Sequence, residues 1–224
     1  MTDYYTEYLN ANKLKQCYEI APERVKQYLE AEISFVADKC KSSDVLLDLG
    51  CGYGRVAFRL EEKVNRLVGI DNSKDNIQLA NKLRRENSKC EFIEMNAVDL
   101  IFEDNLFDIV ICVQNGISAF KVDPEKLIEE SIRVTKKEGI LLFSSYSEKF
   151  WDDRFKWFSM QSEAGLIGEI DYNQTKKGII SCKDGFKSIT FSKEDFLKLA
   201  DNFNVETAIH EIDDSSIFCE MIVK

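Results

Sequence analysis

The chain of 224 residues is long enough for one well-buried α/β domain and short for two. Its net charge of −10 argues against a broad nucleic-acid surface, which clustered Lys and Arg would create. No apolar run is long enough to span a bilayer, and the N-terminus lacks the features of a signal peptide, so we expect a cytoplasmic protein without membrane contact. Seven scattered cysteines without a Cys-x-x-Cys pair, and one histidine, His210, predict reduced thiols and no metal site.

Strand and helix patterns alternate through the first two thirds of the chain. Two N-terminal helices are predicted over residues 5–17 and 22–40. Short apolar runs then predict five strands, at residues 45–49, 67–70, 91–95, 107–113 and 139–146. Helices between them are predicted at residues 55–63, 74–86 and 123–134, and in the last of these Asp123 is the expected N-cap.

This alternation stops after residue 146. An aromatic-rich segment over residues 150–158 precedes a hairpin predicted at 178–182 and 186–191, because Asp184-Gly185 is a favoured hairpin turn. A helix over residues 192–201 follows, and two strands at 205–212 and 217–223 end the chain. The pattern therefore predicts five parallel strands and then a late antiparallel hairpin.

The most informative feature is a glycine-rich loop between two strands. The apolar run 45–49 leads into Gly50, Gly52 and Gly54, and the next apolar run ends in Asp71. In a βαβ unit this places bare backbone and a carboxylate at the carboxyl ends of adjacent strands, where open α/β sheets bind nucleotide-like ligands. A dinucleotide fingerprint would need a third glycine where Arg55 stands, and no Gly-Lys-Ser/Thr sequence closes a P-loop, so both of those classes are disfavoured.

These glycines and the two acids, Asp48 and Asp71, resemble the first two motifs of class I S-adenosylmethionine-dependent methyltransferases. Residues 17–29 and 164–170 look like those of an uncharacterised prokaryotic subset of the small-molecule type. The resemblance implies an α/β, Rossmann-like, doubly wound fold. It has a mostly parallel seven-stranded sheet with an antiparallel last strand, N-terminal helices and an α+β insertion that forms a lid.

We expect a single domain with four parts. Residues 1–40 form an N-terminal helical cap, and 41–146 form the cofactor-binding core. Residues 147–191 are the insertion, or lid, and 192–224 are the C-terminal helix and strand hairpin.

The resemblance assigns the methionine and ribose side of an S-adenosylmethionine site. Gly50, Gly52 and Gly54 would lie under the methionine part, and Asp71 would accept hydrogen bonds from both ribose hydroxyls. Asp48 would either reach the amino group through water or only brace the loop. Arg55 has two open interpretations, contact with the cofactor carboxylate or the start of its helix. From position alone, Tyr18 and Arg24 could close over the methionine end.

The adenine side follows from the same resemblance. Asn72 would lie beside the adenine edge, and Ser73 would either do the same or cap the next helix. Asn96 and Ala97 stand where an acid and a small residue often occur, and Asn96 can accept through its carbonyl oxygen; Asp99 is the alternative acid. The backbone near Gln114 would receive the amino group of the cofactor.

The acceptor pocket is expected outside the shared core. Asn115, Tyr146 and Trp151 are the candidate substrate contacts, and no catalytic residue is assigned. Transfer from a sulfonium is an in-line displacement to a nitrogen or oxygen of a small molecule, and it needs a base only where the acceptor is protonated. We expect a monomer or homodimer. The alternatives are a cofactor-binding regulatory or partner protein without transfer activity, and a methyltransferase acting on a macromolecule.

Overall fold

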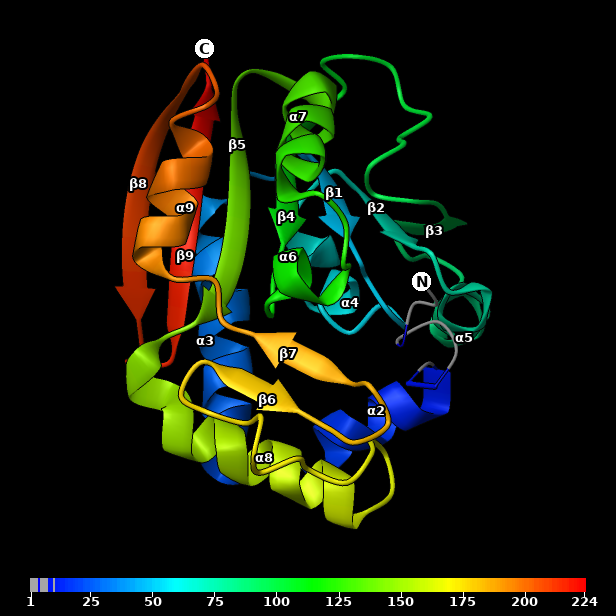
Figure 1. Cartoon of the computed structure of the whole chain (residues 1–224). Helices are drawn as coiled ribbons and strands as arrows, with labels where there is room; N and C mark the ends of the chain where they lie inside the picture. The colour runs from blue at the N-terminus through cyan, green and yellow to red at the C-terminus, as the bar shows by residue number, and fades with distance from the viewer. Residues whose placement is uncertain (1–3, 5–7, 10) are drawn as a thin grey trace.

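The computed structural model describes Tyr4, Tyr8, Leu9 and residues 11–224. Its main sheet has seven strands in the order β3-β2-β1-β4-β5-β9-β8 (Figure 1). Their bounds are β1 Val45–Leu49, β2 Arg66–Asp71, β3 Cys90–Glu94, β4 Phe107–Cys112, β5 Thr135–Tyr146, β8 Val205–Ile212 and β9 Ser216–Val223. The strands from β3 to β5 are parallel, whereas β9 is antiparallel to both of its neighbours. The predicted mostly parallel sheet with an antiparallel last strand is confirmed.

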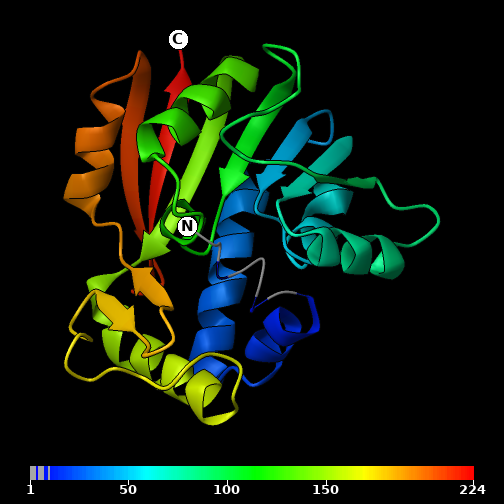
Figure 2. The ribbon, with the colours of Figure 1, turned by 45° about the vertical axis from the view of Figure 1, so that its right-hand side comes forward.

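Helices cover both faces of this sheet (Figure 2). On one face lie α3 (Glu23–Lys39), α4 (Ala57–Leu60) and α5 (Lys74–Leu83), and on the other lie α7 (Pro124–Val134) and α9 (Lys193–Ala200). Two-sided cover buries almost every side chain of β1, β2 and β4, which explains their continuous apolar runs. No helix in the described part of the chain is both long and apolar enough to cross a membrane.

The predicted helix starts are confirmed at three places. Ser73, Asp123 and Ser192 each accept a backbone hydrogen bond in the first turn of α5, α7 and α9. A reciprocal bond from the Ser192 backbone to Asp195 completes a capping box at α9. These caps fix where three of the helices begin against the sheet.

Several element ends differ from the prediction. α5 stops three residues early because Arg84 leaves the helical conformation and donates to the Cys90 carbonyl (3.1 Å). β5 starts at Thr135 rather than 139, because α7 continues directly into it. The helix expected over 55–63 forms only as the short α4 and a 3-10 turn, Glu61–Lys63.

The N-terminal helix lies in part outside the described residues. Of the predicted range 5–17, residues 5–7 and 10 are not described, and the helix that is described, α2, spans Ala11–Glu19. The short α6 (Gly116–Ala119) after β4 is not predicted from the sequence.

Residues 147–191 form a compact layer beyond the carboxyl ends of the parallel strands (Figure 1). They comprise a 3-10 turn (Glu148–Phe150), α8 (Trp151–Glu163) and the two-stranded sheet of β6 (Ile179–Ser181) and β7 (Lys187–Ile189), which confirms the predicted hairpin. Aromatic side chains of this layer share a core with α2 and α3. α8 was not predicted as a helix, because its apolar residues do not recur on one face. Its buried face includes Arg154, which donates to Ser188.

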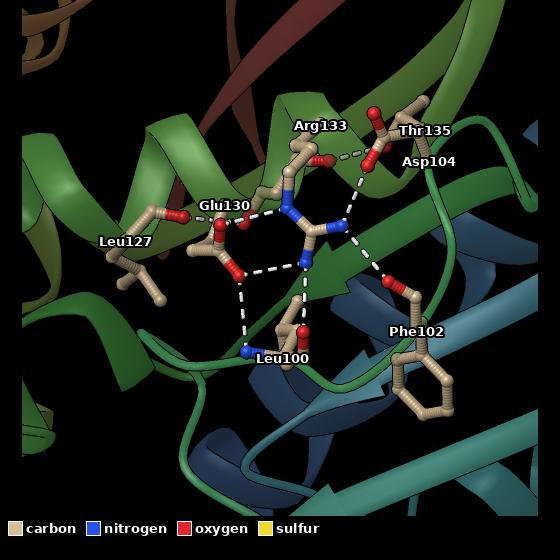
Figure 3. A network of polar contacts seen from close by, with 8 residues as sticks. Leu100, Phe102, Asp104, Leu127, Glu130, Arg133 and Thr135 are labelled. Carbon is tan, nitrogen blue, oxygen red and sulfur yellow. Dashed lines mark hydrogen bonds and ion pairs between the residues drawn. The ribbon is translucent and has the colours of Figure 1, made fainter.

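The long loop after β3 is held to α7 by one arginine. The Arg133 guanidinium donates to the carbonyls of Leu100 and Phe102, and it also pairs with Asp104 and Glu130 (Figure 3). The Glu130 carboxylate in turn accepts from the Leu100 N–H (3.0 Å). This network fixes a loop that begins at residues 95–97, at the carboxyl end of β3.

We expect Arg133→Met to lower the free energy of unfolding by about 1–3 kcal/mol, because two backbone carbonyls and two carboxylates lose a charged donor. Urea unfolding measures the change. The matched control is Lys136→Met, which removes an ion pair with Asp108 between partly exposed side chains and should cost about 0–1 kcal/mol. Equal losses in the two variants would contradict a special role for Arg133.

Candidate functional site

A deep cavity opens at the carboxyl ends of β1, β2, β4 and β5. Its mouth is open to solvent, and concave sites of this kind are where small ligands and cofactors bind. One half is lined by residues from the sheet edge: Gly50, Gly52, Asp71, Asn72, Asn96, Ala97 and Gln114. The other half is lined by aromatic residues from α2, α3, β5 and the 147–191 layer: Tyr18, Tyr28, Tyr146, Trp157, Phe158 and Phe186.

The glycine loop turns sharply at the end of β1. The N–H groups of Gly50 and Cys51 both donate to the Ile70 carbonyl (2.8 and 2.9 Å), and Gly50 has a φ of 72°. A side chain at Gly52 would press on Leu14 at 3.1 Å, so the backbone here lies open to the cavity only because it carries none. Gly54 has a different role: a Cβ there would meet Phe58 and Phe92 at 2.8 Å, and the residue does not line the cavity.

Asp71 connects this loop to the start of α5. Its carboxylate accepts from the Gly52 N–H (2.9 Å), the Ser73 N–H (2.8 Å) and the Asn76 side-chain amide (3.1 Å). Asn76 also accepts from the Ala11 N–H (2.6 Å), which ties the first residues of α2 to the same corner. Asn76 was not predicted as a site residue, because the sequence does not distinguish a buried asparagine in the first turn of a helix from an exposed one.

A polar corner lies behind the glycine loop. The side chains of Asp48, Arg55, Gln114 and Tyr18 line it together with Gly50 and Gly52. Three of its buried atoms, Asp48 Oδ2, Arg55 Nη2 and Gln114 Nε2, have no hydrogen-bond partner among the described residues. Burial raises the pKa of Asp48 to about 7, with Arg55 opposing that rise and Asp71 adding to it. Unsatisfied buried polar atoms are costly, so this corner is suited to a polar ligand.

Two residues at the end of β4 adopt a strained conformation. Gln114 and Asn115 have φ values of 56° and 62°, in the left-handed region that most side chains disfavour and asparagine tolerates better. The Gln114 side-chain oxygen accepts from the Tyr18 hydroxyl (2.8 Å), and the Gln114 backbone N–H donates to Glu32 and Ser144. Such strain gathers at binding sites, where the surrounding contacts maintain it.

The aromatic half of the cavity contains few polar groups. The Trp157 Nε1–H donates to the Cys17 carbonyl (2.8 Å) and so ties α8 to α2. The Tyr28 hydroxyl is buried and has no hydrogen-bond partner among the described residues. Gln161 also lines this half, with 3% of its surface exposed. Of the candidates named from the sequence, Tyr18 and Tyr146 line this half, and the aromatic-rich segment at 150–158 contributes Trp157 and Phe158.

Several candidates lie apart from the cavity. Asn115 is buried, and its side chain accepts from Ser145 (2.6 Å) rather than lining the pocket. Trp151 stacks on Phe155 and lines a separate depression beside Arg154.

Three further residues are also placed elsewhere. Asp99 does not line the cavity, whereas Asn96 does. Arg24, which could close over the methionine end, does not line the cavity, and its guanidinium pairs with Asp213 (2.5 Å). His210 packs against Phe35, far along the sheet in β8.

A methyltransferase-domain family model matches residues 40–177, more than half of the chain. The chain belongs to the methyltransferase family. Its expected resemblance to the class I S-adenosylmethionine-dependent enzymes is confirmed, and S-adenosylmethionine is the cofactor of that class. No group of three or more potential metal ligands occurs within the residues described.

One curated relative is the ubiquinone biosynthesis O-methyltransferase of Coxiella burnetii, 29% identical over 145 residues, which are 62% of this chain and 56% of that protein. The chain spans about half the length of the curated relatives it matches. Among solved structures, the PH0226 protein of Pyrococcus horikoshii aligns over 100% of both chains with a TM-score of 0.70 and 23% identity. The N-methyltransferase NodS of Bradyrhizobium japonicum, solved with S-adenosylhomocysteine, covers 95% of this chain and 99% of its own, with a TM-score of 0.58 and 13% identity. These two likenesses concern the fold.

Proposed function

We propose that this chain transfers a methyl group from S-adenosylmethionine to a nitrogen or oxygen atom of a small molecule. The polar corner carries the proposal. Its three unpartnered buried atoms are one carboxylate oxygen and two nitrogen donors, a set complementary to an amino-acid zwitterion. The ammonium group of the cofactor's methionine part would donate to Asp48. The carboxylate of the same methionine part would accept from Arg55 and Gln114.

The remaining sheet-edge residues suit the nucleoside part. The bare backbone of Gly50 and Gly52 would let the ligand lie against the loop, and Asp71 would accept from the ribose hydroxyls. Asn72, Asn96 and Ala97 would border the adenine ring. Gly54, which packs on two phenylalanines, would act on the loop and not on the ligand.

The aromatic half of the cavity is the proposed acceptor site. When bound, S-adenosylmethionine supplies an activated methyl group. The side chains of Tyr146, Trp157 and Phe158 would exclude water and hold a flat or amine acceptor in line with that group. Orientation of this kind can supply roughly 7–11 kcal/mol of the barrier reduction. The name of the Coxiella relative, which acts in ubiquinone biosynthesis, agrees with a small-molecule acceptor.

A direct test incubates the purified chain with S-adenosylmethionine and a panel of small phenols and amines, and measures S-adenosylhomocysteine by mass spectrometry. We expect product with at least one small acceptor. Cofactor binding without transfer to any small molecule, RNA or protein in the panel would favour a regulatory or partner protein instead. Transfer to RNA or protein alone would identify a macromolecular methyltransferase.

Asp48 gives the proposal a pH signature. The pKa of Asp48 is about 7 in the free protein. Below that pH the carboxyl group is protonated, and it must lose its proton before it can accept from the ammonium group of the ligand. We expect affinity for S-adenosylhomocysteine to rise about tenfold from pH 6 to pH 8, as the carboxylate becomes ionised. Calorimetric titration at several pH values measures this.

The Asp48→Asn variant is the control, and its affinity should change much less between pH 6.5 and 8. Because the folded-state pKa is raised from 3.8 to about 7, Asp48 lowers the stability of the free protein as pH rises from about 4 to about 7. An identical pH profile in the wild type and the variant would exclude Asp48 as the ammonium partner.

A further inference from the structure

We propose that Glu32 is a positioning residue: from α3, its buried carboxylate holds the Gln114 turn in the shape that binds the cofactor, and protonation of Glu32 weakens that binding. The inference rests on the proposed function and goes beyond it, because Glu32 lies outside the cavity. The residue has 0% of its surface exposed. A fully buried glutamate is rare unless its oxygens are paired.

The carboxylate of Glu32 connects the end of β4 to the start of β9. One oxygen accepts from the Gln114 N–H at the end of β4 (3.0 Å), and the other accepts from the Ser216 hydroxyl at the start of β9 (2.5 Å). The same Gln114 N–H also donates to the Ser144 hydroxyl in β5 (2.8 Å). Glu32 thus bridges α3 to the sheet edge that forms the site.

The contact acts on the strained part of the site. Because the peptide bond is planar and trans, fixing the Gln114 N–H also fixes the Val113 carbonyl on the opposite side, where it accepts from Gly116 (3.2 Å). Gln114 and Asn115, the two left-handed residues, lie between these anchors. The position of the Gln114 side chain, which faces both the cavity and the polar corner, depends on that turn.

The charge state of Glu32 decides how strongly it holds the turn. An ionised carboxylate accepts charge-assisted hydrogen bonds on both oxygens, whereas the protonated form loses that strength. Burial raises the pKa of Glu32 to about 6, and its hydrogen bonds and Arg55 oppose that rise. The other titratable groups that face it are Tyr18 of α2, Tyr28 of α3, Cys112 of β4 and Tyr146 of β5. The pKa values of these four are all raised, so they remain neutral between pH 5 and 8.

The test compares the wild type with Glu32→Gln in calorimetric titrations with S-adenosylhomocysteine from pH 5 to pH 8. Glutamine keeps the shape and the acceptor but never ionises. We expect the variant to bind about tenfold more weakly at pH 8 and within about twofold of the wild type at pH 5, where most of the wild-type Glu32 is protonated. Taking the ratio of the two affinities cancels the titration of Asp48, which both proteins share.

Matched variants separate positioning from stability. Glu23→Gln, an exposed glutamate on the same helix, should leave the affinity unchanged at every pH. Ser216→Ala removes one donor to the ionised carboxylate and should move the fall in affinity to higher pH, while affinity at pH 8 stays near that of the wild type. The melting temperature of free Glu32→Gln at pH 8 should not fall below that of the wild type, because a buried charge is removed.

An affinity ratio that is constant across pH, or close to one throughout, would overturn the role of Glu32 while leaving the proposed function intact. If Glu32→Gln has a lower melting temperature than the wild type but the same affinity, Glu32 contributes only to stability. If neither protein binds the compound at any pH, the proposed function itself fails.

Discussion

Replacing Asp71 with alanine should weaken binding of S-adenosylhomocysteine by about 1.5–3 kcal/mol, roughly 10- to 150-fold. Two losses combine in this variant. The ligand would lose charged hydrogen bonds to its ribose, and the Gly52 N–H, the Ser73 N–H and the Asn76 amide would lose the acceptor that fixes the loop. Calorimetric titration at pH 8 measures the effect.

Two variants make this result specific. Asp71→Asn retains the shape and one carbonyl acceptor, so its loss should be smaller than that of Asp71→Ala. Asp75→Ala removes an exposed carboxylate in the first turn of the same helix and should leave the affinity unchanged. If Asp71→Ala binds like the wild type, Asp71 does not contact the ribose.

Replacing Gly50 with alanine should weaken cofactor binding by changing the shape of the loop. The residue has a φ of 72°, where a Cβ costs about 1–2 kcal/mol. The added methyl group would also overlap the Phe120 ring, which itself lines the cavity. Either the Phe120 ring or the loop must then shift, and both border the space proposed for the ligand, so we expect a loss of at least about 1.4 kcal/mol, or tenfold, in affinity.

Gly165 provides a matched control for Gly50. It has a φ of 69°, and a Cβ there would meet nothing within 4 Å. Gly165→Ala should therefore show the backbone cost in urea unfolding, about 1–2 kcal/mol, and bind the cofactor normally. If Gly50→Ala and Gly165→Ala bind the cofactor equally well, close approach of the ligand to the Gly50 backbone is not needed.

The sheet and the sheet-edge half of the cavity were predictable, because both depend on patterns that are local in the sequence. Buried parallel strands appear as apolar runs, and glycine is the favoured residue at a tight turn where φ is positive. Gly50, Gly52 and Asp71 follow from that logic and meet at one edge of the sheet. Gly54 shares the motif, but its lack of a side chain makes room for Phe58 and Phe92.

The aromatic half and the buried network were not predictable, because they depend on tertiary contacts. Trp157, not Trp151, lines the cavity, and only the packing of α8 against α2 decides between them. The sequence of α3 does not mark Glu32 as different from an exposed glutamate. Its burial depends on contact with the end of β4 and the start of β9, where Gln114 and Ser216 donate to its carboxylate. Arg133 is similar: its partners come from a loop about thirty residues earlier in the chain.

The most direct measurement is a calorimetric titration of the purified chain with S-adenosylmethionine and with S-adenosylhomocysteine at pH 8. A zwitterion-sized polar corner beside a bare glycine loop predicts one site per chain with micromolar affinity for both compounds, about 8 kcal/mol of binding free energy. Absence of binding to either compound at millimolar concentration would contradict the assignment of this cavity.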